Sequence, residues 1–257
     1  MSSEKNQNPC IIILAAGKGK RMNNPSLAKV MATLDGKPLI EHVLIEANKL
    51  LPEKIIIVVG HQKDNVIDYV QSLGFSNISF VEQKEQLGTG HAVNQARSEL
   101  LNYDGDILIL AGDVPLLSSE TLINFIENHK KNESDVSVLT ALAPNPYGYG
   151  RIIRDDEGNF IKIVEEKDAS EDEQKENEIN SGVFLLKSDL LFDSLQAVSN
   201  QNSQGEYYLT DIIEILKRKN VKVYAYAGAE FDELQGVNSP ENLKKVEEFY
   251  YIGKSKK

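Results

Sequence analysis

Residues 11–22 read IIILAAGKGKRM, an apolar run that passes directly into a glycine-rich basic turn. The apolar part, residues 11–14, predicts a buried strand of a parallel sheet. Small residues after the strand leave backbone N–H groups uncovered, so a polyanionic phosphate can approach them closely. Lys18, Lys20 and Arg21 add positive charge to a chain whose net charge is −11. The stretch therefore predicts a phosphate-binding turn, with a solvated basic turn as the alternative.

Two common phosphate-binding motifs do not match this turn. A P-loop requires Gly-Lys followed by Ser or Thr, but the Gly-Lys pairs at residues 19–20 and 36–37 are followed by Arg21 and Pro38. The dinucleotide-binding pattern requires a third glycine, and Met22 stands in that place. ATP hydrolysis of the kinase type and nicotinamide chemistry are therefore poorly supported.

The bulk composition is that of an ordinary globular protein. The chain has 257 residues, 41% hydrophobic and 26% charged, enough for one large domain or two closely packed lobes. Its negative net charge argues against general nucleic-acid binding, which needs a basic face. Cys10 is the single cysteine, so no intramolecular disulfide and no cysteine-based zinc site is expected. The apolar residues 10–16 are too short to cross a bilayer and lack the pattern of a secretory signal, so we expect a cytoplasmic protein without a membrane partner.

Apolar strands alternate with helical patterns in the first part of the chain. Strands are predicted at residues 11–14, 55–59, 78–81 and 107–110. A helix that Pro38 opens carries the apolar positions Ile40, Val43, Leu44, Ala47 and Leu51, and a second helix follows residues 88–90. This alternation predicts an α/β fold with a doubly wound, mostly parallel sheet.

The pattern changes after residues 136–139. Short strands at residues 151–154, 160–164 and 182–186 predict a smaller mixed lobe, followed by a helix at 209–216, a strand at 221–226 and a last helix. The expected organisation is a disordered segment at 1–9, one domain at 10–252 and a basic tail at 253–257. That domain would comprise a first lobe at 10–115, a second lobe at 116–238 and the last helix at 240–251.

Two polar residues follow predicted parallel strands, where ligands gather in open α/β sheets. Asp113 follows the strand at 107–110 and faces the glycine-rich turn, so it is a candidate ligand for a divalent cation. An Asp before this segment's proline is alternatively a turn former or helix cap. Gln83 follows the strand at 78–81, and its amide could pair with a pyrimidine edge, unless it is a solvent-facing loop residue.

A series of further motifs narrows these alternatives. In order they are Gln83, EQLGTGHA (85–92), GDVPL (112–116), NPYGYGR (145–151), IVEEKDA (163–169), EINSG (178–182), QGEYYLTD (204–211) and GVN (236–238). Together with residues 14–22 and Lys29, they resemble the uridylyltransferase half of the bacterial bifunctional N-acetylglucosamine-1-phosphate uridylyltransferase/glucosamine-1-phosphate acetyltransferase family. The resemblance runs from residue 11 to the last helix and implies a Rossmann-like fold of the nucleotide-diphospho-sugar transferase type.

The resemblance also implies a role for each matching residue. Catalysis would depend on Arg21, Lys29 and Asp113. The nucleotide would contact Leu14, Ala15, Ala16, Gly17, Lys29, Gln83, Gly88 and Thr89, the last three at the uracil. Gly150, Glu165, Asn180 and Asn238 would contact the amino sugar or its diphosphate, and Asp113 and Asn238 would bind Mg²⁺. The first lobe would thus bind the nucleotide and the second the sugar.

The implied activity is Mg²⁺-dependent transfer of a uridylyl group from UTP to N-acetylglucosamine-1-phosphate, which yields UDP-N-acetylglucosamine, a cell-wall precursor, and pyrophosphate. One alternative is a nucleotidyltransferase for another sugar-1-phosphate such as glucose-1-phosphate. A second alternative, of a different class, is a non-catalytic regulatory protein that binds sugar nucleotides.

The chain departs from the family pattern in several places. Lys20 and Ala28 replace a threonine and a proline, a residue is inserted around residues 23–26, and Ala111 stands where some members have an aromatic residue. No hexapeptide repeats follow Asn238, so acetyl-CoA chemistry and the associated trimer are not expected. The oligomeric state stays open.

Overall fold

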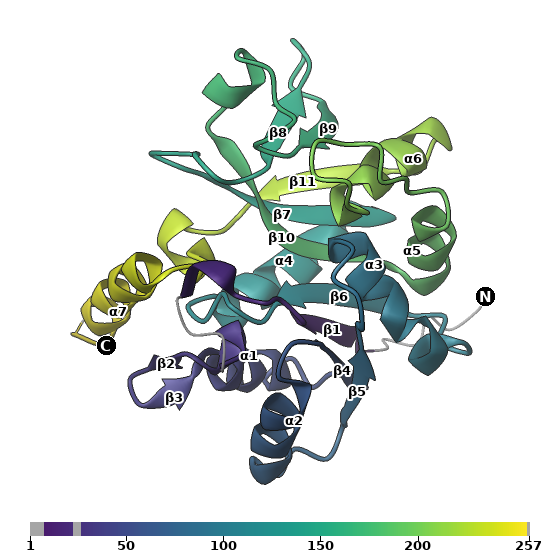
Figure 1. Cartoon of the computed structure of the whole chain (residues 1–257). Helices are drawn as coiled ribbons and strands as arrows, with labels where there is room; N and C mark the ends of the chain where they lie inside the picture. Colours follow the sequence, from purple (N-terminus) through teal and green to yellow (C-terminus); the bar gives the residue numbers. More distant parts are fainter. Residues whose placement is uncertain (1–7, 23–26, 256–257) are drawn as a thin grey trace.

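The computed structural model describes residues 8–22 and 27–255. Its centre is a nine-stranded sheet in the order β11-β7-β10-β6-β1-β4-β5, which β8 and β9 join through β10 (Figure 1). The strands are β1 (Cys10–Ala15), β4 (Ile55–Val59), β5 (Ile78–Glu82), β6 (Asp106–Ala111), β7 (Val136–Leu142), β8 (Arg151–Arg154), β9 (Phe160–Val164), β10 (Glu178–Lys187) and β11 (Val223–Ala227). A separate hairpin pairs β2 (Thr33–Leu34) with β3 (Lys37–Pro38).

Helices cover both faces of the sheet. They are α1 (Leu39–Asn48), α2 (Lys63–Ser72), α3 (Thr89–Asn94), α4 (Ser119–Lys131), α5 (Ser188–Leu195), α6 (Ile212–Arg218) and α7 (Pro240–Ser255). Short 3-10 turns include η1 (Lys20–Met22), η2 (Lys29–Met31), η3 (Gln95–Leu100), η4 (Glu173–Lys175), η5 (Leu209–Asp211) and η6 (Phe231–Leu234). None of the helices in the described ranges is long and apolar enough to cross a membrane.

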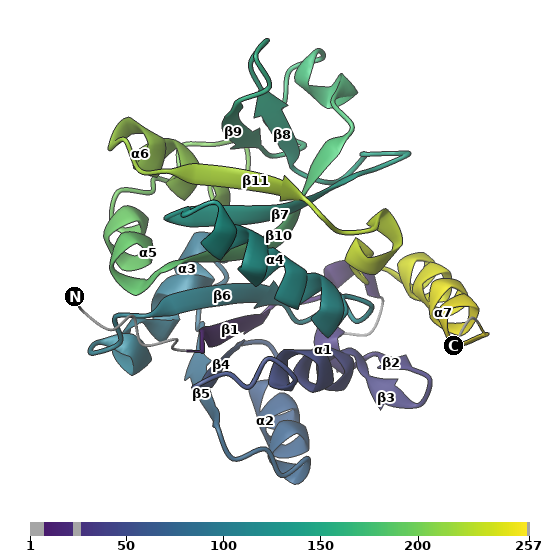
Figure 2. The ribbon, with the colours of Figure 1, turned by 180° about the vertical axis from the view of Figure 1, so that it is seen from behind.

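The apolar sequence of β1 explains its central place. It pairs in parallel with β4 on one side and β6 on the other. Successive side chains of a strand point to opposite faces, so Ile11 and Ile13 join the core under α1, α2 and α4, whereas Ile12 joins the core under α3, α5 and α6. Figure 2 shows α1 and α4 on the face turned away from the viewer in Figure 1. The predicted doubly wound α/β fold is confirmed.

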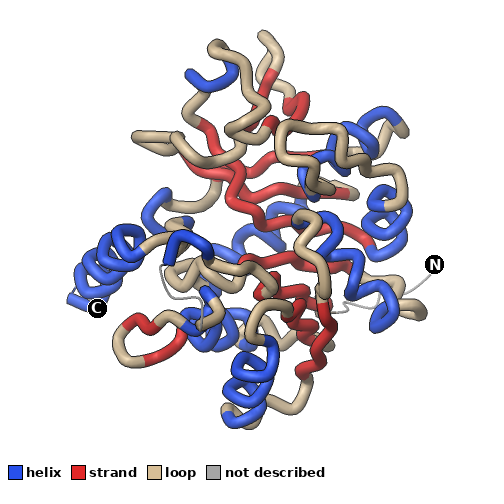
Figure 3. Tube along the Cα trace, viewed as in Figure 1, coloured by secondary structure: helices blue, strands red, loops and turns tan. Residues whose placement is uncertain are grey.

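The sheet continues without a break into the second lobe (Figure 3). Strand β10 runs antiparallel to both β6 and β7, while β11 pairs in parallel with β7. The strands predicted at 151–154 and 160–164 form the antiparallel pair β8–β9. The two lobes therefore share one sheet and its two cores.

Several expectations from the sequence differ from the structure. The strand predicted at 182–186 begins at Glu178, and the helix predicted at 209–216 begins as the 3-10 turn η5 and continues as α6 to Arg218. Leu51 is 72% exposed, because α1 ends at Asn48 and Leu51 adopts a φ of 53° outside the helix. Pro9 is buried and its carbonyl accepts a hydrogen bond from the Glu53 N–H, so packing begins before the predicted domain boundary. Helix α7 extends to Ser255 through part of the predicted tail. Residues 1–7, the insertion at 23–26 and residues 256–257 lie outside the described ranges.

Candidate active site

The glycine-rich loop that follows β1 closes around Lys29. Gly19 has a φ of 58°, and a Cβ on it would lie 2.9 Å from Cβ of Lys29, so a glycine is required for this approach. Gly17, which is exposed, faces Cε of Lys29 at 3.9 Å from its would-be Cβ. The loop is fixed at its start, where the Leu14 carbonyl accepts a 2.9 Å hydrogen bond from the Gly112 N–H. The loops after β1 and β6 therefore lie side by side.

An ion pair centred on the Lys29 ammonium forms where these two loops meet the segment before α7. The ammonium of Lys29 donates to Oδ2 of Asp113 at 2.5 Å and to Oδ1 of Asn238 at 2.9 Å. The Val237 N–H also donates to the Asp113 carbonyl, at 2.9 Å, which fixes Asn238 beside the end of β6. We call Lys29, Asp113 and Asn238 the cation cluster. In Figure 1 the purple turn after β1 accordingly lies next to the yellow α7.

The chemistry of this cluster fits a hard cation. Asp113 and Asn238 direct a carboxylate and an amide oxygen at one positively charged group, the Lys29 ammonium. Such oxygens are the ligands that Mg²⁺ prefers, usually completed by water and substrate phosphate. Among the described residues no group of three or more His, Cys, Asp or Glu side chains is placed to hold a metal ion, so water and substrate phosphate would have to supply the remaining ligands here.

Gln83 and the residues after it form a second cluster. Gln83 is only 3% exposed, and its Nε2 donates to the Gly88 carbonyl at 3.0 Å. The same nitrogen lies 3.0 Å from Nδ1 of His91. Because these contacts occupy the amide nitrogen, the amide oxygen of Gln83 is the atom left to accept a hydrogen bond.

Gly150, Glu165 and Asn180 form a third cluster where β8, β9 and β10 meet. The Asn180 N–H donates to the Gly150 carbonyl at 2.8 Å, and a Cβ on Gly150 would lie 3.5 Å from the Val164 carbonyl oxygen. Glu165, the residue after β9, accepts a 3.0 Å hydrogen bond from the Thr210 hydroxyl. Burial is the largest cause of its raised pKa, which nearby carboxylates raise further.

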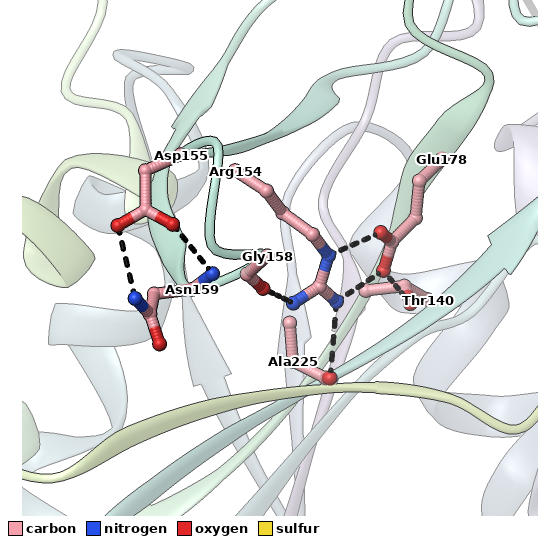
Figure 4. A network of polar contacts seen from close by, with 7 residues as sticks. All are labelled: Thr140, Arg154, Asp155, Gly158, Asn159, Glu178 and Ala225. Carbon is pink, nitrogen blue, oxygen red and sulfur yellow. Dashed lines mark hydrogen bonds and ion pairs between the residues drawn. The ribbon is translucent and has the colours of Figure 1, made fainter.

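An ion pair anchors the strand that carries Asn180. The Arg154 guanidinium binds both carboxylate oxygens of Glu178, at 2.7 and 2.8 Å, and Thr140 donates to the same carboxylate at 2.6 Å (Figure 4). Arg154 also donates to the Ala225 carbonyl, at 3.3 Å. One guanidinium thus joins β8 to β10 and β11. Its contact on β10, Glu178, lies two residues before Asn180.

Tyr149, the residue before Gly150 of the third cluster, interacts electrostatically with Asp113 of the cation cluster. Burial raises the pKa of its phenol, and the negative charge of Asp113 raises it further. The ring packs edge-on against Phe231 at 5.8 Å. The segment that leads into Gly150 therefore lies within electrostatic reach of Asp113.

Eight of the predicted site residues thus lie in three clusters: Lys29, Asp113 and Asn238; Gln83 and Gly88; and Gly150, Glu165 and Asn180. Of the others, Leu14 and Ala15 end β1, Ala16 and Gly17 begin the loop after it, and Thr89 begins α3 directly after Gly88. Arg21 is the last of them. This residue lies in η1, next to the glycine-rich loop, with its side chain exposed. The sequence analysis assigned no role to Tyr207 or Thr210, which contact residues of the second and third clusters. Their only signal was membership of the motif at 204–211.

A large cavity of about 860 Å³ lies elsewhere. It is lined by residues of α1, α7 and the segment after β6, among them His42, Glu46 and Tyr250. None of the predicted site residues lines it. We therefore place the candidate site at the three clusters, which hold the predicted side chains, and not at this cavity.

Comparison with known proteins identifies the family and the fold of the chain. A sequence model for the family described as "Nucleotidyl transferase" matches residues 10–232. A protein named "Bifunctional protein GlmU" from Lactobacillus gasseri is 48% identical over 231 residues, which cover 90% of this chain and 49% of that protein. A protein of the same name from Lactobacillus delbrueckii subsp. bulgaricus is 46% identical over 228 residues, covering 89% of this chain and 48% of that protein. The chain spans about half the length of these curated relatives.

Solved structures show the same fold. A UDP-glucose pyrophosphorylase complexed with UDP-glucose superimposes with a TM-score of 0.77 at 21% identity, covering 95% of this chain and 99% of that one. A putative glucose-1-phosphate thymidylyltransferase from Bacillus anthracis gives a TM-score of 0.73 at 18% identity, covering 93% and 94%. At these identities the likeness concerns the fold alone.

Proposed function

The chain belongs to the nucleotidyl transferase family, and from this premise we propose that it transfers a uridylyl group from UTP to N-acetylglucosamine-1-phosphate. The products are UDP-N-acetylglucosamine and pyrophosphate. Relatives at 46–48% identity that are named bifunctional GlmU proteins support this choice, as do the motifs that the chain shares with the uridylyltransferase half of that family. A cytoplasmic location is part of the proposal.

The cation cluster is the observation that carries the proposal. A transfer between two polyanions is limited by their mutual repulsion and by the charge that develops on the leaving group. Lys29 lies under the glycine-rich loop, where its ammonium can neutralise phosphate oxygens that the backbone N–H groups also contact. Arg21, exposed in η1 beside the loop, would add a second cation.

The reaction needs no general base. The phosphate of the sugar substrate is already anionic at neutral pH, and its oxygen attacks the α-phosphorus of UTP. A new P–O bond forms as the bond to the β-phosphate breaks, and the electron pair leaves with pyrophosphate. Alignment of the two substrates and compensation of charge are therefore what the protein must supply.

Asp113 and Asn238 would hold Mg²⁺ in this proposal, because their oxygens converge on a cation in the structure. When bound, the ion would neutralise phosphate charge as a Lewis acid. Gln83 would accept a hydrogen bond from the uracil N3–H through its free amide oxygen. Glu165 and Asn180 would contact the amino sugar.

Pyrophosphate release from UTP and Mg²⁺ tests the proposal, with N-acetylglucosamine-1-phosphate, glucose-1-phosphate and glucosamine-1-phosphate as acceptors. CTP, GTP and dTTP are run in parallel. We expect a strong preference for UTP with the N-acetylated sugar. Turnover with another pair would retain the mechanism and overturn the substrate. Binding of UDP-N-acetylglucosamine without any pyrophosphate release would favour the regulatory protein instead.

A further inference from the structure

The motif at 204–211 forms a backbone clamp on the loop that contains Gly88. The Tyr207 N–H donates to the Leu87 carbonyl and the Gly90 N–H donates to the Tyr207 carbonyl, both at 2.8 Å. A Cβ on Gly88 would lie 2.5 Å from the Tyr207 carbonyl oxygen, so a larger residue cannot be accommodated. The Leu209 N–H then donates to Oγ1 of Thr89 at 3.0 Å.

The next residue, Thr210, contacts the third cluster through Glu165. Thr210 is 5% exposed, and its hydroxyl donates to Oε1 of Glu165 at 3.0 Å. Its neighbours Leu209 and Ile212 are buried in the core, so the backbone that carries the hydroxyl is fixed. Four consecutive residues thus connect the Gln83–Gly88 cluster to the carboxylate proposed to contact the sugar.

The surroundings of Glu165 make this hydrogen bond important. Burial raises the pKa of its carboxyl group, and the negative charges of Asp211, Asp168 and Glu206 raise it further. The Thr210 hydroxyl is the group that acts in the opposite direction. Asp168 follows β9, and Glu206 and Asp211 flank Thr210 along the chain. The hydroxyl is therefore a neutral donor among carboxylates.

We propose that Thr210 is a positioning residue, which aims the Glu165 carboxylate at the sugar and couples its placement to that of the nucleobase loop. The inference rests on the proposed function, in which Glu165 contacts the sugar. A merely structural Thr210 would affect stability and both substrates alike. A positioning Thr210 acts selectively on the sugar substrate and on the pH dependence of its use.

Thr210→Val removes the hydroxyl at nearly constant volume, and Thr210→Ser retains it. We expect Thr210→Val to raise KM for N-acetylglucosamine-1-phosphate about tenfold while KM for UTP changes less than about twofold. The acid limb of kcat/KM for the sugar phosphate should move to higher pH, since loss of the donor raises the Glu165 pKa further. Thr210→Ser should behave like the wild type. In a Glu165→Gln background, Thr210→Val should cause no additional pH shift.

Thr121→Val is the matched control. Thr121 is also a buried threonine that donates to a glutamate, Oε2 of Glu233 at 2.6 Å, but at the start of α4. It should leave both KM values and the pH profile unchanged. If Thr210→Val fails to fold, Thr210→Cys supplies a weaker donor for the same comparison. Equal changes in both KM values, or an unmoved acid limb, would overturn the proposal.

Calorimetric binding of UDP-N-acetylglucosamine and of UDP separates this inference from the proposed function. Thr210→Val should weaken binding of UDP-N-acetylglucosamine about tenfold and leave binding of UDP unchanged. If the wild type releases no pyrophosphate but this difference persists, the proposed activity is wrong and the positioning role stands. If the wild type is active and Thr210→Val binds both ligands normally, the positioning role is wrong.

Discussion

The ammonium nitrogen of Lys29 lies 2.5 Å from Oδ2 of Asp113, although 84 residues separate the two along the chain. Both side chains are largely buried, with 17% and 13% of their surface exposed. Screening by solvent is therefore weaker than for a surface pair, and the positions of both groups are well defined. The pair connects the loop after β1 to the end of β6, and Asn238 adds the start of α7.

Substitution of Lys29 should impair the reaction without unfolding the protein. We expect Lys29→Ala to lower kcat for pyrophosphate release by about 10²–10³, because one preorganised electrostatic contact is lost. Lys49→Ala is the control, since Lys49 directly follows α1 and its exposed side chain pairs with Glu46. Steady-state rates and thermal melting of both variants provide the test. Turnover near the wild-type rate in Lys29→Ala would remove Lys29 from the mechanism.

Asp113→Asn should weaken the dependence on magnesium. A neutral amide is a poorer ligand for a hard divalent cation than a carboxylate, so half-maximal activity should require about tenfold more Mg²⁺. Rates are measured over a magnesium titration at saturating UTP. Asp172→Asn serves as the control, because its side chain is 91% exposed in a surface pair. An unchanged titration for Asp113→Asn would contradict the metal assignment.

Gly88→Ala should damage UTP binding through a backbone clash. Its Cβ would lie 2.5 Å from the Tyr207 carbonyl oxygen, so the clamp between residues 87–90 and 207–209 must open. Gly158→Ala is the matched comparison. Gly158 also has a positive φ, 82° against 113° for Gly88, but a Cβ there meets nothing within 4 Å. Calorimetric titration with UTP should show weakened binding for Gly88→Ala alone; equal losses would attribute the effect to backbone strain.

Glu178→Leu should destabilise the second lobe. It leaves the Arg154 guanidinium and the fully buried Thr140 hydroxyl without their shared carboxylate, at a cost of about 2 kcal/mol. Glu214→Leu removes an exposed ion pair with Arg218 and should change the free energy of unfolding by less than about 0.5 kcal/mol. Urea denaturation of both variants measures the difference. Equal stability would show that the Arg154 network is energetically neutral.

Asp211 should make stability depend on pH. Burial, assisted by Glu214 and Asp168, raises its pKa from 3.8 to about 6 in the folded state. The folded protein therefore binds the Asp211 proton more tightly than the unfolded chain does. The stability that Asp211 contributes is present at low pH and is lost as pH rises through about 6. Asp211→Asn should therefore stabilise the protein above that pH, by about 1 kcal/mol after allowance for partial exposure.

Urea midpoints at about pH 4 and pH 8 test this sign, and the gain should be absent at the lower pH. Asp172→Asn, at an exposed position, should show no such pH-dependent gain. A stabilisation of Asp211→Asn that is equal at both pH values would contradict the proton-linked explanation.

Much of the fold follows from local patterns. The all-apolar Ile55–Val59 and its counterparts predict buried parallel strands because only strands covered on both faces tolerate such runs. The strands at 151–154 and 160–164 agree with β8 and β9 in both bounds. Leu51 shows where the pattern fails, because one apolar residue in helical register does not reveal that the helix has already ended.

Some features of the candidate site can likewise be predicted from the sequence, and others cannot. The glycine-rich loop, its basic charge and the residues at strand ends can be recognised from the sequence, since phosphate binding and sheet polarity depend on short stretches of chain. The pairing of Lys29 with Asn238, 209 residues apart, and that of Thr210 with Glu165 were decided only by the folded chain. Hydrophobic periodicity specifies which face of an element is buried. Which polar side chains meet depends on the crossing of strands and the path of loops, which tertiary packing alone determines.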